Sequence, residues 1–244
     1  MVTEDESEPE RDEMEAPDSD GSLYLATGDD VPETRALLTG DIVDDVTIAG
    51  LEDPEGLAII LTHPCSMRVD GVALAPRIVV ARVRPHQHVA FGQWKGYARL
   101  MPLPSLIGDE HHACFFDSIG VVDGAALAAV PRVACLSDRG INLLQQRFIF
   151  NLTRFVVPTA RLHEACAAVF REVDLQEEWV MAAVDAGIDH EEALGEFHQW
   201  IRAGDSASGV MRQERLQQAQ AIGALQRDLR LEIKSRYVPG TGLD

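Results

Sequence analysis

Three short pairs of histidine and cysteine stand out in the middle of the chain, because each holds two possible metal ligands or proton carriers two residues apart. They are His63-Pro-Cys65, His86-Gln-His88 and His112-Ala-Cys114. In an extended strand, residues i and i+2 point to the same face. Two pairs on neighbouring strands could therefore form a tetrahedral zinc site, with His63, Cys65, His112 and Cys114 as ligands. The spacing matches no zinc-ribbon or zinc-finger pattern, and free cysteine is often a small buried residue. We therefore favour no metal site and no cofactor.

The first of these pairs ends an apolar run, LAIILTHPCSMRVD, where Pro64 cannot donate to a sheet. The run predicts a central strand that leaves the sheet at His63. A cysteine nucleophile is conceivable here, because Arg68 and His63 could lower the pKa of Cys65. The flanking residues carry no signature of a cysteine enzyme, so we do not favour it.

Short strand patterns separated by turns fill the chain from about residue 38 to residue 136, and a helical period begins near Asp138. From Thr159 onward the spacing of apolar residues is helical, and the last helix carries a narrow apolar stripe typical of packing against one partner. We predict an α+β fold, a small SH3-like β-barrel followed by an α-helical C-terminal extension. The expected parts are a disordered acidic tail over 1–30, the barrel over 31–157 and the extension over 158–244.

Charge is spread unevenly over the 244 residues. The net charge is −19, with −17 in residues 1–60, +4 in residues 61–160 and −6 in the remainder. The basic middle weakens the objection that an acidic protein repels nucleic acid. The four cysteines are too few for a disulfide scaffold, and neither a signal peptide nor a transmembrane run is visible. We expect a cytoplasmic protein without membrane contact.

The barrel part resembles the MazF/PemK-like toxin family of SH3-like barrels with a CcdB-type fold. The likeness covers roughly residues 38–152. It rests on GDIV at 40–43, LAIILTH at 57–63, RIVVARV at 77–83 and the segment from Asp117 to Phe148. The resemblance implies RNA cleavage without a metal and a cognate antitoxin as partner.

Two positions depart from the family pattern. The Arg-Pro pair expected before the second strand is replaced by DPEGLAII, and the third strand ends in RVRPHQH rather than in threonine or serine. Cleavage of RNA needs a base, an acid and a cation. We therefore name His63, Arg68, Arg82 and His86 as candidate catalytic residues. Arg82 and Arg84 could equally be the solvent-facing side of an alternating strand.

Aromatic and basic residues after the third strand could bind RNA bases by stacking. The candidate binding residues are Arg84, Trp94, Lys95 and Tyr97, although aromatic residues in one loop often anchor packing instead. Two functions follow. The first is a non-catalytic or degenerate toxin-like barrel that acts as a binding or accessory subunit, with a protein partner or self-association through its terminal helices. The second is an active metal-independent endoribonuclease toxin, in which RNA meets the basic middle.

Overall fold

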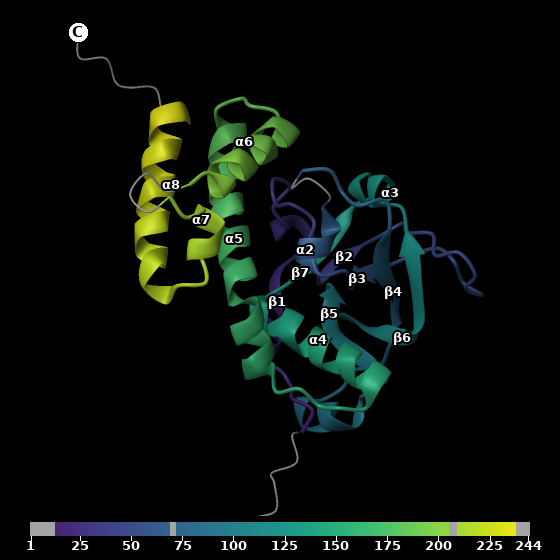
Figure 1. Cartoon of the computed structure of the whole chain (residues 1–244). Helices are drawn as coiled ribbons and strands as arrows, with labels where there is room; N and C mark the ends of the chain where they lie inside the picture. The colour runs from purple at the N-terminus through teal and green to yellow at the C-terminus, as the bar shows by residue number, and fades with distance from the viewer. Residues whose placement is uncertain (1–12, 69–71, 205–208, 238–244) are drawn as a thin grey trace, which may run out of the picture.

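The computed structural model describes residues 13–68, 72–204 and 209–237. Within these residues, seven strands form one antiparallel sheet in the order β1-β7-β2-β3-β4-β6-β5. The strands are β1 Tyr24–Thr27, β2 Asp41–Val43, β3 Ala58–Ile60, β4 Ile78–Pro85, β5 Leu100–Ile107, β6 Glu110–Val122 and β7 Arg132–Leu136. The sheet curls into a nearly closed barrel (Figure 1).

The two edges of the sheet meet through a side chain rather than a ladder. The Tyr24 hydroxyl on β1 donates to the carbonyl of Pro104 on β5 at 3.0 Å. Pro102 and Pro104 lie within β5 and offer no backbone N–H. Both prolines are therefore tolerated in β5, which is last in the strand order.

Helices cover the open side of the barrel and extend beyond it. The barrel carries α1 Asp20–Leu23, η1 Gly28–Asp30, α2 Pro64–Met67, η2 Phe91–Gly96, α3 Gly124–Ala128 and α4 Asp138–Thr153. The extension holds α5 Thr159–Asp185, α6 His190–Arg202, α7 Arg212–Arg215, η3 Ala219–Ala221 and α8 Ile222–Tyr237. The predicted α+β class, a barrel followed by a helical extension, is confirmed.

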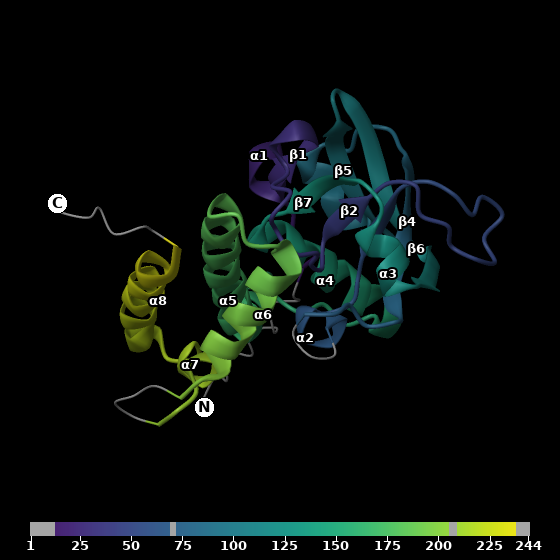
Figure 2. The same cartoon turned by 90° about the horizontal axis from the view of Figure 1, so that it is seen from above.

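The long helix α5 joins the two parts. It stands between the barrel on one side and α8 on the other (Figures 1 and 2). Its first half contributes Cys166 and Phe170 to the barrel core. Its second half builds a separate core around Trp179, which is fully buried.

The predicted disordered tail needs correction over its second half. Residues 1–12 lie outside the described residues, but residues 13–30 pack on the barrel and include β1, which pairs with β7. Met14 and Leu23 are buried there. Apolar residues spaced among the acids provide enough burial to order this segment.

No helix in the described part of the chain is both long and apolar enough to span a bilayer.

Candidate functional site

Arg82, a predicted catalytic residue, holds the backbone together instead. Its side chain is 1% exposed. The guanidinium donates to the carbonyls of Leu57 and Val46, each at 3.0 Å, and also to that of Pro54. Burial lowers the pKa of Arg82, while Asp53 opposes the change. Arg82 therefore fixes the loop between β2 and β3 and has no free donor face for a substrate.

Arg68 has a similar structural role. It lies at the end of α2, largely buried, and donates to the carbonyl of Leu37 at 3.2 Å. Burial lowers the pKa of Arg68; Asp41 opposes this change and Arg132 adds to it. Together, Arg68 and Arg132 hold the segment that leads into β2.

His63 begins α2 rather than facing a substrate. Its Nδ1 accepts from the backbone N–H of Cys65 at 3.3 Å, and its Nε2 lies 3.9 Å from the sulfur of Cys166. Partial burial lowers the pKa of His63. Partial burial also raises the pKa of Cys65, and Glu172 and Cys166 raise it further. The Cys65 sulfur is therefore held as a thiol, which makes it a poor nucleophile.

The four residues considered as zinc ligands do not come together. His112 and Cys114 lie on the core side of β6 and are buried, whereas His63 and Cys65 lie by α2 and α5. Burial strongly raises the pKa of Cys114. Over residues 13–68, 72–204 and 209–237, no three or more histidine, cysteine or acidic side chains gather in a way that could hold a metal.

Trp94 and Lys95, two predicted binding residues, are engaged within the protein. Trp94 is fully buried, and its Nε1–H donates to the carbonyl of Val89 at 3.1 Å. The guanidinium of Arg147 lies 4.9 Å from the centre of the Trp94 ring. The ammonium of Lys95 contacts the carboxylate of Glu13. Trp94 is therefore not free to stack on a base, whereas the Lys95 side chain stays exposed beside Glu13.

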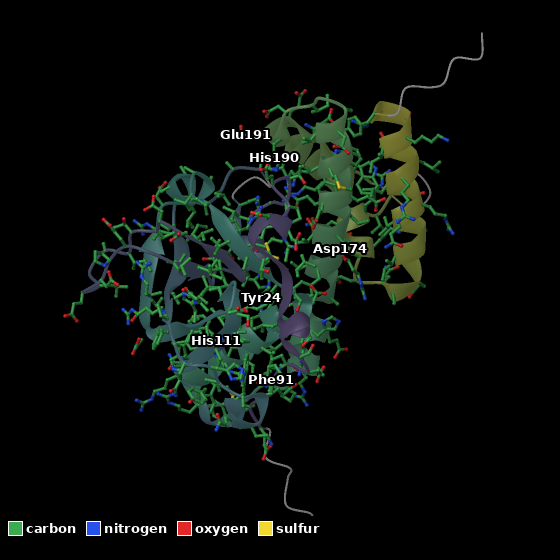
Figure 3. All side chains as sticks on the ribbon, turned by 180° about the vertical axis from the view of Figure 1, so that it is seen from behind. Tyr24, Phe91, His111, Asp174, His190 and Glu191 are labelled. Atoms are coloured by element: carbon green, nitrogen blue, oxygen red, sulfur yellow. The ribbon has the colours of Figure 1, made fainter. Side chains whose placement is uncertain are left out.

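The remaining predicted residues gather on the outer face of the barrel, together with His88 of the second pair and two residues that the sequence did not single out, His111 and Phe115. We call this group the histidine surface. It consists of Arg84, His86, His88, Tyr97, His111 and Phe115. Figure 3 places His111 at the end of the barrel far from His190 and Glu191 of the extension.

Pairing of β4 with β6 builds this surface. Pro85 lies opposite His112, and the backbone N–H of His86 then donates to the carbonyl of His111 at 2.9 Å. Opposite residues of an antiparallel pair share one face, about 5 Å apart at Cβ. His86 and His111 therefore stand side by side, and the His88 ring lies 4.8 Å from that of His111.

Aromatic rings and a cation frame the histidines. The His86 ring meets the Tyr97 ring edge-on at 6.0 Å and the Phe115 ring at 6.2 Å. The guanidinium carbon of Arg84 lies 5.5 Å from the centre of the Phe115 ring. All four side chains are only partly buried. A ligand can therefore reach rings and charge from one side.

The hydrogen bonds assign opposite tautomers to the two facing histidines when both are neutral. The Nδ1 of His86 lies 2.8 Å from the carbonyl of Gln87, so Nδ1 carries the proton and Nε2 keeps its lone pair. The Nδ1 of His111 accepts the backbone N–H of Ser105 at 3.0 Å, so Nε2 carries the proton. One ring thus presents a lone pair that can accept a proton, and the other presents an N–H that can donate a hydrogen bond.

A backbone irregularity produces the second of these hydrogen bonds. Ser105 has a φ of +49°, in the left-handed region that favours glycine, and the β5–β6 register shifts between Leu103 and Ile107. A bulge of this kind redirects backbone groups, and such features are common beside functional sites. Here it turns the Ser105 N–H towards His111.

Neither the models of known protein families nor the curated protein sequences give a match to this chain.

Proposed function

We propose that this protein is a metal-independent endoribonuclease whose active site is the histidine surface. The observation that carries the proposal is the pair of complementary tautomers on His86 and His111, whose backbones are paired where β4 and β6 end on a partly exposed face. Cleavage of RNA by its own 2′-hydroxyl requires a proton to be removed from that hydroxyl and a proton to be supplied to the leaving oxygen. Histidine performs both roles near neutral pH.

In the proposed step, Nε2 of His86 removes the proton of the 2′-hydroxyl. The 2′-oxygen then forms a bond to phosphorus while the bond to the 5′-oxygen breaks. The imidazolium formed on His86 gives the proton to that leaving oxygen, which also accepts a hydrogen bond from Nε2–H of the neutral His111. The products are a 2′,3′-cyclic phosphate and a 5′-hydroxyl, so no water or metal is consumed. Arg84 offsets the charge that develops on the phosphoryl oxygens.

Tyr97 and Phe115 would hold the substrate. Their half-exposed rings flank His86 and can stack on bases of single-stranded RNA. Stacking tolerates many sequences, so the proposal concerns unpaired RNA rather than one sequence. The likeness of residues 38–152 to MazF/PemK-like toxins agrees with this chemistry and would add a protein antitoxin as partner.

The accessory-subunit hypothesis rested on the two departures from the family pattern and on the apolar stripe of the last helix, and the second of these supports is lost. The apolar stripe of α8, formed by Leu225, Leu229 and Ile233, is buried in the core around Trp179 of α5. It therefore packs within the chain and is not a free docking surface. A binding protein that does not cleave RNA remains the outcome of a negative result below.

The test is cleavage of a short unpaired RNA by the full chain in excess chelator. We expect His86→Gln and His111→Phe each to lower the rate by about 100-fold or more, the size of a general-base contribution for His86 and of a lost hydrogen-bond donor to developing charge for His111. The matched control is His63→Asn, which removes another predicted histidine but keeps a side chain that can begin α2. It should retain the wild-type rate.

Three results would contradict the proposal. One is a folded protein that leaves RNA intact in chelator. Another is cleavage that survives both histidine changes. The third is an equal loss of rate in His63→Asn.

A further inference from the structure

A cavity lies between the barrel and α5, away from the histidine surface. Its volume is about 430 Å³. Its walls come from α1, the segment before β2, the junction of β7 with α4, and the middle of α5. Asp174, labelled in Figure 3, lies on α5 at this junction. Cavities of this size hold small molecules.

Two acids and two arginines line this cavity, and one of the arginines, Arg139, is already paired with Glu15 at 2.9 Å. The acids are Asp138 and Asp174, and Glu177 lies one turn further along α5. Burial raises the pKa of Asp138, against the effect of His163 and Arg35. Burial also raises the pKa of Asp174, with Asp138 and Glu177 adding to it and Arg35 opposing. A bound cation would relieve this repulsion.

Arg35 is the second, independent feature of the cavity. Its residue surface is only 6% exposed. Within the described residues its guanidinium makes no hydrogen bond: Nε has no partner, and the contact with Glu177 is 3.7 Å long. A buried guanidinium with unused donors is costly and calls for an acceptor. Arg35 lines the cavity wall, so a ligand oxygen can supply that acceptor.

The remaining lining has an apolar part, with Leu38, Ile141 and Phe170, and a polar part, with Ser22, Thr39, Ser137 and Arg139. A ligand that suits every wall needs a cationic donor, an anionic acceptor and an apolar body. We propose that this cavity binds an α-amino acid with an apolar side chain. Its ammonium lies between Asp138 and Asp174, its carboxylate lies on Arg35, and its side chain contacts the apolar wall. This site is independent of RNA cleavage.

The test is calorimetric titration of the full chain with phenylalanine and leucine, with thermal unfolding as a second readout. Two matched compounds remove one charged group each: phenethylamine lacks the carboxylate, and 3-phenylpropanoate lacks the amine. We expect phenylalanine or leucine to bind and to raise the melting temperature with concentration. The two matched compounds should each bind at least about tenfold more weakly than phenylalanine.

Asp174→Asn and Arg35→Gln should each weaken amino-acid binding by about tenfold or more. The Asp174 side chain is exposed on α5, so Asp174→Asn should fold. This variant still tests the proposal if Arg35→Gln fails to fold. Asp185→Asn, at the exposed end of the same helix, is the control and should bind normally. The proposal is overturned if neither amino acid binds, if phenethylamine binds as tightly as phenylalanine, or if Asp185→Asn loses as much affinity as Asp174→Asn.

Discussion

Arg82 and Arg84 lie two residues apart on β4 and face the same side of the sheet, yet their environments are opposite. Arg82 is sealed beneath the loop between β2 and β3 and donates to three backbone carbonyls. Arg84 is half-exposed beside the Phe115 ring. The difference in burial comes from the loop between β2 and β3 that covers Arg82, and not from the alternation of side chains along β4. Only Arg84 is therefore available to a phosphate.

Removing the charge should separate the two roles. Arg82→Met should lower the free energy of unfolding by about 3 kcal/mol or more, because buried carbonyls lose charged donors. Arg84→Met should change it by less than about 0.5 kcal/mol, as is usual for surface sites, but should slow RNA cleavage. Urea unfolding of both variants measures the first effect. An equal destabilisation by Arg84→Met would contradict the assignment.

The sequence predicted His86 but not His111 as part of the site. The sequence pointed to His86 through the His86-Gln-His88 pair and to Arg84 through alternation along the strand, and both need only local pattern. His111 becomes a neighbour through the β4–β6 register, and its ring is oriented by the bulge at Ser105. A register of this kind depends on long-range pairing that a single sequence does not specify.

At the scale of elements, the start of α5 depends on a residue that precedes it by 144 positions. Pro158 offers no side-chain cap. Glu15 supplies it: its carboxylate accepts the Thr159 N–H at 2.8 Å and pairs with Arg139 at 2.9 Å. A carboxylate at the start of a helix accepts hydrogen bonds from the free backbone N–H groups there, and its negative charge is stabilised by the positive end of the helix dipole. The acidic composition of residues 1–20 predicted disorder. Composition alone does not show that one of these acids, Glu15, has hydrogen-bond partners elsewhere in the chain.

Glu15→Gln should therefore destabilise the fold by about 1 to 2 kcal/mol at neutral pH. Burial raises the pKa of Glu15, but hydrogen bonds from Thr159 and Arg139 outweigh it and lower the pKa below its usual value. A lowered folded-state pKa gives stability that is present above the unfolded pKa and is lost as pH falls through the folded one. The difference from wild type should thus shrink as the pH drops below about 4.

Urea unfolding of wild type and Glu15→Gln, at neutral pH and again below about pH 4, measures this difference in the free energy of unfolding. Glu13→Gln is the control, since Glu13 only contacts Lys95 on the exposed surface and should matter by less than about 0.5 kcal/mol. A gap between wild type and Glu15→Gln that stays constant with pH would rule out the cap.

At the scale of the whole molecule, two cores share one helix. The barrel core takes Cys166 and Phe170 from α5, and the extension core forms around Trp179 further along it. The helical spacing of its apolar residues predicted that α8 carries a narrow apolar stripe. The same pattern predicted that this stripe packs against one partner. Its partner proves to be α5 and α6 of the same chain. Periodicity shows that a face is buried but not what buries it.

Leu229→Ala should reduce stability by about 2 to 4 kcal/mol, because the side chain is fully buried between α8 and its neighbours. Leu231→Ala, on the side of α8 that is 66% exposed at this residue, should have little effect. Thermal unfolding of the isolated protein compares the two. No loss of stability in Leu229→Ala would mean that the stripe is free for an external partner.

The chemical ends of the RNA fragments test the central claim most directly. Mass spectrometry of fragments made in excess chelator distinguishes a 2′,3′-cyclic phosphate from a 3′-hydroxyl. Proton transfer by His86, with a hydrogen bond from His111 to the leaving oxygen, predicts a 2′,3′-cyclic phosphate paired with a 5′-hydroxyl, and no cleavage where the attacking 2′-hydroxyl is replaced by hydrogen. Fragments with 3′-hydroxyl and 5′-phosphate ends, or cleavage at a 2′-deoxy position, would contradict it.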